Sequence, residues 1–348
     1  MAKINAAIFG ASGYTGQELV RILLSHPQVN LIAASSRRYA GVPLAKVYPS
    51  LLGKTDMEFI NATASEVAKS ADVVFLALPH QVSQNAAGEI ALTGKRIIDL
   101  SADFRLADVK TYEEWYTKHT QQDLLKKFVY GLPELFREEI KGAQMIANPG
   151  CYPTSILLAL APVVKMALIK NDSLIINSCS GVSGAGREPS VGSLFCEVAQ
   201  GFKAYKAGGK HRHTPEIEQG LTRFAGAPVK VTFTPHLLPV NRGILSTSYA
   251  SLAKKVTAAE IHACFQDFYC SENFVRIYPL GELPNINAVT GTNLCDIGIA
   301  LDERTERLII VSAIDNLVKG AAGQAAQNMN IIFDFPEGQG LETTSIFP

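Results

Sequence analysis

The sequence has no excess of charge of either sign, because its 348 residues include 32 Lys and Arg against 32 Asp and Glu. This balance gives no general attraction to nucleic acid or to an acidic membrane, so we expect neither as a partner. No apolar run reaches the roughly 20 residues of a transmembrane helix. The apolar stretch at 4–9 is too short for a signal peptide. We therefore expect a soluble, cytoplasmic protein.

Closely spaced cysteines are also absent. None of the six cysteines belongs to a C-x-x-C pair. In a large reduced protein, most cysteines are small buried hydrophobic residues. No cysteine or third histidine lies near His211 and His213 in the sequence, so we expect no bound metal ion.

Short apolar runs alternate with helical patterns in the first half of the chain. Hydrophobic residues make up 47% of the sequence, enough for a sizeable core, and the length predicts about two domains. The alternation predicts a Rossmann-type α/β domain, with a parallel sheet and helices on both faces. Its expected elements are strands at 4–9, 31–35, 73–78, 96–100 and 143–147, and helices at 14–24, 82–92 and 112–127, with a short helix ending at 70.

The second half contains longer strands rich in Val, Ile, Thr and Ser. Fewer helices lie between them, which predicts an α+β domain with a mixed or antiparallel sheet. The expected elements are strands at 173–179, 229–235, 244–252, 294–300 and 308–313, helices at 155–167, 215–224 and 258–268, and a final amphipathic helix at 318–332.

A glycine-rich loop directly follows the first expected strand and precedes a helix. In this context G-x-x-G-x-x-G is a variant of the dinucleotide fingerprint, in which the glycines allow a tight turn, close approach of a pyrophosphate and close helix packing. The helix N-terminus favours the anion. The alternative is a tight turn without a ligand. The candidate cofactor contacts are Gly10, Ser12, Gly13, Tyr14, Thr15 and Gly16.

The end of the second expected strand indicates which dinucleotide binds. Folds that prefer NAD place an acidic residue there for the ribose 2′-hydroxyl. This chain has Ser36, Arg37 and Arg38 instead. Hydroxyl and guanidinium groups suit a 2′-phosphate, so we expect NADP(H) as the cofactor. The alternative is that both arginines are solvated loop charges.

Cys151 lies between an expected strand and an expected helix. With Pro153 as the first helical residue, Cys151 lies just ahead of the helix N-terminus, whose dipole lowers the pKa of a thiol. A thiolate beside a nicotinamide attacks an aldehyde or an activated acyl carbon. We expect Cys151 to be the nucleophile, with the Asn148 side chain helping to stabilise the oxyanion. The alternative is a small buried residue at the domain junction.

His211 and His213 precede another expected helix, with Thr214 as N-cap and Pro215 as its first residue. Residues i and i+2 of an extended segment project to one face, so either histidine could be the acid/base. The alternative is a solvated basic loop.

Further candidates follow other strand ends. Ser101 and Arg105 come after the strand at 96–100, where Arg105 could bind a substrate phosphate bidentately. Arg187 ends the glycine-rich segment 180–187 and could bind an anionic group. The alternative for each arginine is a surface ion pair. The remaining candidate cofactor contacts are Pro79, Ser180, Gly181, Gly184 and Asn316.

Four motifs together resemble the N-acetyl-gamma-glutamyl-phosphate reductase family of arginine biosynthesis: Gly10–Gly16, Asn148–Thr154, Ser180–Arg187 and His211–Glu216. The similarity covers essentially the whole chain, and the cysteine motif is its specific part. It implies a fold like that of aspartate-semialdehyde dehydrogenase and glyceraldehyde-3-phosphate dehydrogenase. The implied domains are an NADP-binding Rossmann domain at 1–148 with 318–348, and a catalytic and oligomerisation domain at 149–317.

The resemblance also implies NADPH-dependent reduction of N-acetyl-glutamyl 5-phosphate to the 5-semialdehyde, with release of phosphate, by a homodimer or homotetramer. Cys151 matches the family's catalytic cysteine, and the active-site histidine falls within 211–213. Aspartate-semialdehyde dehydrogenase and the aminoadipyl-phosphate reductase of lysine biosynthesis are alternatives within the class. A nucleotide-sensing protein without catalysis is the alternative outside it.

Overall fold

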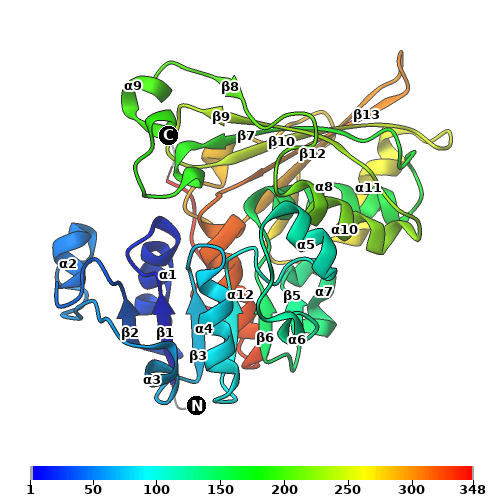
Figure 1. Ribbon diagram of the computed structural model, residues 1–348. Helices are drawn as coiled ribbons and strands as arrows, with labels where there is room; N and C mark the ends of the chain where they lie inside the picture. Colours follow the sequence, from blue (N-terminus) through cyan, green and yellow to red (C-terminus); the bar gives the residue numbers. More distant parts are fainter. Residues whose placement is uncertain (1–2, 347–348) are drawn as a thin grey trace. The chain divides into compact units, whose positions relative to one another are not determined.

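The computed structural model describes residues 3–346, and the chain divides into two compact units (Figure 1). Residues up to 149 together with 321–342 form the first unit, and residues 150–320 with the segment from 343 form the second. Among the described residues, no helix combines the length and the apolar composition that crossing a membrane requires.

The first unit is built on a parallel sheet in the strand order β2-β1-β3-β4-β6-β5. Its strands are β1 (Ile4–Phe9), β2 (Val29–Ser35), β3 (Val73–Leu76), β4 (Arg96–Asp99), β5 (Phe128–Tyr130) and β6 (Met145–Ala147). Every residue of β3 is buried, as expected for a central strand covered on both faces. The predicted Rossmann-type parallel sheet is confirmed. The edge strand β5 was not among the expected elements. It is only three residues long and follows the stretch at 112–127, where a helix was expected.

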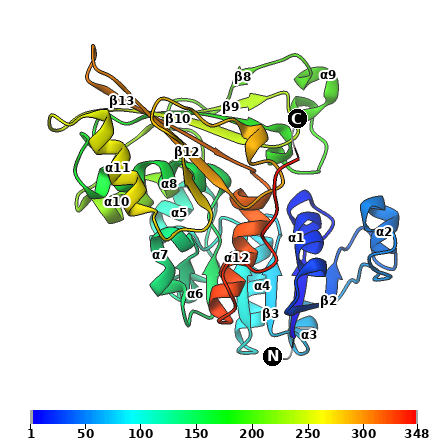
Figure 2. The same ribbon diagram turned by 180° about the vertical axis from the view of Figure 1, so that it is seen from behind.

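Helices flank both faces of this sheet (Figures 1 and 2). They are α1 (Tyr14–Ser25), α2 (Leu44–Val47), α3 (Ala64–Ala68), α4 (Val82–Ala91), α5 (Val109–Trp115), α6 (Gln122–Leu125), α7 (Pro133–Ile140) and α12 (Gly323–Ile332). The prediction of one helix over 112–127 is wrong. Asp108 caps α5 early, and the chain leaves helical geometry at Tyr116. The final helix is also shorter than expected, because a π-helical turn at Val318–Ala322 precedes α12.

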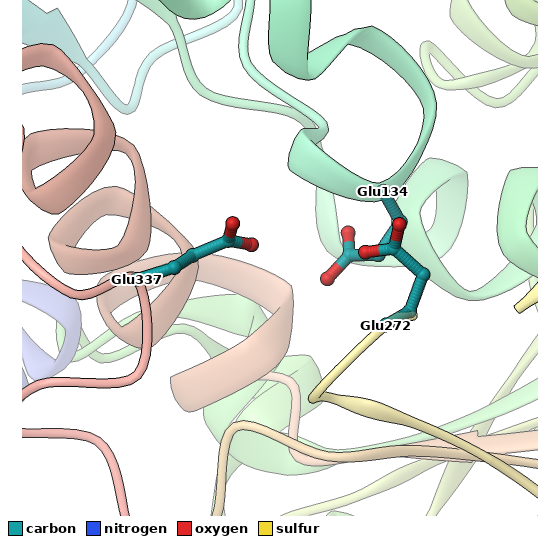
Figure 3. A group of neighbouring side chains, drawn as sticks. All are labelled: Glu134, Glu272 and Glu337. Carbon is teal, nitrogen blue, oxygen red and sulfur yellow. The ribbon is translucent and has the colours of Figure 1, made fainter. Parts of the chain in front are cut away.

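Buried amides of α12 hold the C-terminal segment in the first unit. Gln327 Nε2 donates to Glu134 Oε1 at 2.9 Å and to Glu337 Oε1 at 2.7 Å. Arg137 pairs with Glu337 at 2.8 Å. Figure 3 shows Glu134 on α7 and Glu337 after α12. The bonds of Gln327 and Arg137 join α7 to the end of the chain.

The second unit contains a mixed sheet in the order β11-β12-β13-β10-β7-β9-β8. Its strands are β7 (Ile175–Gly181), β8 (Lys203–Ala204), β9 (Thr232–Leu238), β10 (Ile244–Ser251), β11 (Val275–Ile277), β12 (Cys295–Asp302) and β13 (Arg307–Ile314). Two neighbouring pairs, β7/β9 and β11/β12, are parallel and the others antiparallel. This confirms the prediction of a mixed sheet. The helices α8 (Cys151–Lys165), α10 (Thr214–Ala225) and α11 (Ala258–Phe268) lie on one face (Figures 1 and 2).

Strand β10 shows how the two faces of this sheet differ. Its residues alternate between buried and half-buried. On the covered face, Ser246 contacts Ser155 of α8 at 3.0 Å and Ser178 of β7 at 2.7 Å. Ser155 also bonds to Ser312 of β13 at 2.8 Å. The other face presents the half-buried Leu245, Thr247 and Tyr249 in register with their neighbours on β7 and β13.

Candidate active site

The glycine loop between β1 and α1 has two glycines that the fold itself requires. Gly10 has φ +82°, and a Cβ there would lie 2.2 Å from the Ala77 carbonyl oxygen. A Cβ at Gly16 would lie 2.3 Å from the Gly10 carbonyl oxygen. At Gly13 the nearest atom would be 3.6 Å away, an ordinary contact. The protein therefore tolerates a side chain at Gly13, whereas a pyrophosphate approaching the N-terminus of α1 would not.

The end of β2 lies beside this loop. Ser36 Oγ donates to Ser12 Oγ at 2.9 Å, and the Tyr48 hydroxyl donates to the Ser12 carbonyl oxygen. Arg37 and Arg38 are exposed just beyond Ser36. The residues present thus fit NADP(H): backbone N–H groups for the pyrophosphate, and two exposed guanidinium groups next to hydroxyls for a 2′-phosphate.

Three further candidates of the first unit lie against other groups of the protein. Pro79 lies two residues beyond Ala77, against which Gly10 packs. Ser101 Oγ donates to Asp99 Oδ2 at 2.7 Å. Arg105 is only 8% exposed, and it donates through Nε to the Asn148 carbonyl oxygen at 2.8 Å and through Nη2 to the Leu100 carbonyl oxygen at 2.7 Å. Ser101 and Arg105 therefore hold the chain after β4 and after β6.

Asn148 is fully buried at the end of β6. Its Nδ2 donates to the Ala321 carbonyl oxygen at 3.1 Å, and its Oδ1 accepts from Asn328 Nδ2 at 3.1 Å. Sequence reasoning missed Asn328, whose amide lies within a helix pattern and carries no local signal. These bonds tie the Asn148 amide to Ala321 and to Asn328 of α12. The oxyanion role expected for Asn148 stays a prediction.

In the second unit, α8 begins at Cys151 itself, with Gly150 as N-cap. The expectation that Pro153 opens the helix is wrong, because proline also fits the third helical position, where the N–H has no intrahelical acceptor. The Cys151 side chain is half-buried. At the first position of a fifteen-residue helix it lies where the helix dipole favours a thiolate.

His211 and His213 face the residue next to Cys151. Their rings lie 4.9 Å apart, and the Tyr152 ring meets them edge-on at 5.4 and 5.9 Å. The Tyr152 hydroxyl lies 2.9 Å from that of Tyr205. His213, not Thr214, is the N-cap of α10, so the two histidines lie in a turn rather than an extended segment. The second unit thus places both candidate histidines against Tyr152, the residue that follows Cys151.

The two histidines are not equivalent. His211 Nδ1 accepts the His213 backbone N–H at 3.1 Å. Burial, followed by the charges of Lys206 and Arg212, lowers the pKa of His211 to about 4. His211 is therefore neutral near pH 7, with its proton on Nε2 and its acceptor nitrogen already engaged.

A buried carboxylate joins the histidine segment to the cysteine turn. Glu216 is 1% exposed, and its Oε1 accepts the Gly150 N–H at 2.8 Å. Glu216 is the third residue of α10, and Gly150 caps α8. This bond fixes the start of α10 against the residue before Cys151. Sequence reasoning missed its role, although an acidic residue in a first helical turn was visible in the sequence.

The glycine-rich segment after β7 is held by Asn316. Its Oδ1 accepts the Gly243 N–H at 2.8 Å, and its Nδ2 donates to Ser183 Oγ at 2.9 Å. Ser180 is buried and bonds to the Gly181 carbonyl oxygen at 3.0 Å. Gly184 is exposed and Arg187 half-buried. Asn316 thus positions this segment, in which Gly184 to Gly186 are exposed.

Two family models match this chain. One, described as the NAD binding domain of semialdehyde dehydrogenase, matches residues 5–143, and the other, its dimerisation domain, matches residues 151–316. The two matches correspond to the two domains of the semialdehyde dehydrogenase class, and together they span most of the chain.

Curated relatives identify the family within this class. The chain is 54% identical over 345 residues to the N-acetyl-gamma-glutamyl-phosphate reductase of Desulfotalea psychrophila, covering 99% of this chain and all of the relative. It is 55% identical over 346 residues to the one of Pelotomaculum thermopropionicum, covering 99% of each. The chain belongs to the N-acetyl-gamma-glutamyl-phosphate reductase family.

Solved structures show the same fold at low identity. A structure of aspartate semialdehyde dehydrogenase II from Vibrio cholerae matches 96% of this chain and 99% of its own with a TM-score of 0.73 and 17% identity. Another, of aspartate semialdehyde dehydrogenase with NADP from Candida albicans, matches 95% and 98% with a TM-score of 0.70 and 16% identity.

Proposed function

We propose that this chain reduces N-acetyl-glutamyl 5-phosphate to N-acetyl-glutamate 5-semialdehyde with NADPH, releasing phosphate, in arginine biosynthesis. The observation that carries the proposal is Cys151 at the first position of α8, with both candidate histidines around the adjoining Tyr152. Relatives of that name at 54% and 55% identity over nearly the whole chain support the substrate.

The proposal assigns one role to each unit. The first unit is the NADP-binding domain, with the loop Gly10–Gly16 for the pyrophosphate and Ser36, Arg37 and Arg38 for the 2′-phosphate. The second unit is the catalytic and oligomerisation domain. When bound, NADPH supplies the hydride that reduces the acyl carbon.

The chain's own chemistry begins at Cys151. Its thiolate attacks the acyl carbon, the bond to phosphate breaks, and a thioester to Sγ forms as inorganic phosphate leaves. Backbone N–H groups at the start of α8 stabilise the oxyanion. After reduction at that carbon, the thiohemiacetal expels the Cys151 thiolate and the aldehyde is released.

We assign the acid/base role to His213 and a positioning role to His211. His213 gives a proton to the thiohemiacetal oxygen and takes it back as the carbon–sulfur bond breaks. His211, neutral and bonded through Nδ1 to the His213 N–H, holds that residue in place. In this assignment His213→Ala removes the near-neutral limb of the pH profile of kcat, whereas His211→Ala lowers activity and keeps the limb.

The open face of the second sheet supports the homo-oligomer. The matching family model is described as a dimerisation domain, and α8, α10 and α11 lie on the opposite face of the sheet from Leu245, Thr247 and Tyr249. We propose that a second copy covers it, in a homodimer or homotetramer. The cytoplasmic location stays a prediction.

The reaction is best tested in reverse, because the acyl phosphate is labile. NADP⁺ reduction is followed with N-acetyl-glutamate semialdehyde, with and without phosphate, and with Cys151→Ala as the blank. Phosphate-dependent turnover of this substrate is the expected result. Turnover of aspartate semialdehyde alone would keep the chemistry and overturn the substrate. No turnover of either, with NADPH still bound, would overturn the proposal.

A further inference from the structure

The turn between β3 and α4 is strained. Gln81, the residue before α4, has φ +72° and ψ −43° and is not glycine. A side chain at such an angle is costly unless neighbouring groups hold the backbone there. The turn contains Pro79, a candidate cofactor contact, and starts two residues beyond Ala77, whose carbonyl touches the position of Gly10. The groups that hold this turn therefore also help to shape the edge of the first sheet, where the candidate cofactor contacts Gly10 and Pro79 lie.

Asp103 is the group that holds it. Its carboxylate is fully buried, and Oδ2 accepts the Gln81 N–H at 2.8 Å. Its Oδ1 accepts the Tyr112 hydroxyl at 2.6 Å. Burial first, and then Asp103 itself, hold the pKa of Tyr112 above its ordinary value, so that hydroxyl remains a donor. Both carboxylate oxygens of Asp103 thus face donors.

The same residue also belongs to the segment after β4. The Asp103 N–H donates to Ser101 Oγ at 3.0 Å. A second bond across the two loops comes from Ala102, whose N–H donates to His80 Nδ1 at 3.1 Å. Asp103 therefore lies between the Pro79–Gln81 turn and the Ser101–Arg105 segment, both within the first unit.

We propose that Asp103 is a positioning residue that sets the affinity for the dinucleotide by holding the Pro79–Gln81 turn in its strained conformation. The inference rests on the proposed function, which places NADP(H) at this edge. It adds a residue that touches neither the cofactor nor the substrate.

Asp103→Ala tests the proposal because it removes both carboxylate oxygens and keeps the backbone N–H that bonds to Ser101 Oγ. Gln81 then loses the acceptor that holds its N–H, and Tyr112 loses the acceptor of its hydroxyl. We expect the Kd for NADPH, measured by fluorescence titration, to rise about tenfold, as expected when strain at positive φ is no longer held. The KM for NADPH should follow, and kcat at saturation should change less than about twofold.

Tyr112→Phe is the matched control. It removes the other bond to Asp103 and lowers Tm, but leaves Oδ2 and Gln81 in place. We expect its Kd for NADPH to stay within about twofold of the wild-type value. Gln81→Gly is the rescue, because glycine adopts positive φ without strain. In the Asp103→Ala background it should recover most of the lost affinity.

Three results would overturn the inference: wild-type affinity in Asp103→Ala, an equal loss in Tyr112→Phe, or no recovery with Gln81→Gly. Direct NADPH binding needs no acyl substrate. A wild-type chain that binds NADPH and turns over a different semialdehyde would therefore contradict the proposed function alone. A wild-type chain that does not bind NADPH would overturn both.

Discussion

The helices α3, α5 and α11 begin with a side-chain cap, whereas α1 and α8 begin with glycine. Thr63, Asp108 and Thr257 each accept a backbone N–H from the first turn of the helix they precede. Gly13 and Gly150 offer no such acceptor to α1 and α8. A side-chain cap accepts one of the free backbone N–H groups at the start of a helix. A glycine cap has no side chain to do so, and other groups have to accept from these N–H donors.

The two glycine-capped ends differ in what they offer. At α1 the anion has to come from outside, and the exposed Arg37 and Arg38 nearby suit a dinucleotide phosphate. At α8 the chain itself supplies an anion, since the Glu216 carboxylate accepts the Gly150 N–H, and Cys151 follows as the first helical residue. The proposed function assigns binding of the dinucleotide to the end of α1 and the reaction to the end of α8, so substitutions at the two should separate affinity from turnover.

Cys151→Ser gives the largest expected effect. The hydroxyl is a far weaker nucleophile than a thiolate, so kcat should fall by more than about a thousandfold. The Kd for NADPH should stay at the wild-type value, because the dinucleotide is assigned to the end of α1. Steady-state rates and fluorescence titration on the same preparation check both. Near-normal turnover would remove Cys151 from the nucleophile role.

The histidine turn before α10 predicts a pH-dependent stability. The folded pKa of His211 is about 4, against an ordinary value of 6.5. The unfolded chain takes up a proton near pH 6.5 and the folded chain only near pH 4, so stability is present above pH 6.5 and is lost as pH falls to 4. The loss is on the order of 3 kcal/mol.

Urea unfolding between pH 4 and 7 measures this loss, with His211→Gln as the comparison. Glutamine keeps an acceptor for the His213 N–H and does not titrate. We expect a flatter pH dependence in this variant over the same range. An unchanged acid limb would mean that another group causes it.

Arg37→Ala tests the N-terminal end of α1, to which binding of the dinucleotide is assigned. A charge-assisted bond to a phosphate contributes about 1.5–3 kcal/mol, so kcat/KM for NADPH should fall about 10- to 100-fold. The value for NADH, which has no 2′-phosphate, should be unchanged. Arg38→Ala is the parallel variant, and Arg223→Ala in the second unit is the control for loss of one charge. A preference for NADH in the wild type would contradict the NADP(H) assignment.

Gly13→Ala separates binding from folding at the same helix end. The added Cβ meets only ordinary contacts in the protein, so Tm should stay close to the wild-type value. It would project where the pyrophosphate lies, and the Kd for NADPH should rise about tenfold. Gly16→Ala is the contrasting variant, because backbone overlap there should cost about 1–3 kcal/mol in unfolding free energy. Equal affinity in Gly13→Ala would place the dinucleotide elsewhere.

Thr257→Ala gives the smallest expected effect. It removes the capping box of α11 and should lower the unfolding free energy by about 1 kcal/mol. Turnover and the Kd for NADPH should not change. Thr257→Ser, which keeps the cap, should restore stability. A loss of activity in the alanine variant would show that capped ends also serve the chemistry.

The glycine loop and the buried strands could be predicted because their signals are local. Gly16 is required by contacts with the backbone of Gly10 and Ala11 just before it, and β3 is a continuous apolar run. The order of the motifs along the chain was enough to suggest the family. These features need no knowledge of what packs against them.

The misses depend on partners distant in sequence. Asn328 lies 180 residues from the Asn148 side chain that it bonds to, and Glu216 lies 66 residues from Gly150. Tyr112 sits in a polar stretch, yet it is buried against Asp103. Pro153 looked like a helix start because its residue type fits several first-turn positions equally well.

The serines between α8 and the sheet have a mechanical consequence. Ser155, Ser178, Ser246 and Ser312 are all fully buried, and each bonds to another of the four. Long apolar side chains in that layer could exchange rotamers and let the helix rock. A serine side chain is short, and its hydrogen bond to a neighbouring serine restricts it to one rotamer. The serine bonds therefore limit movement of α8 against the sheet, and with it movement of Cys151 at the start of that helix.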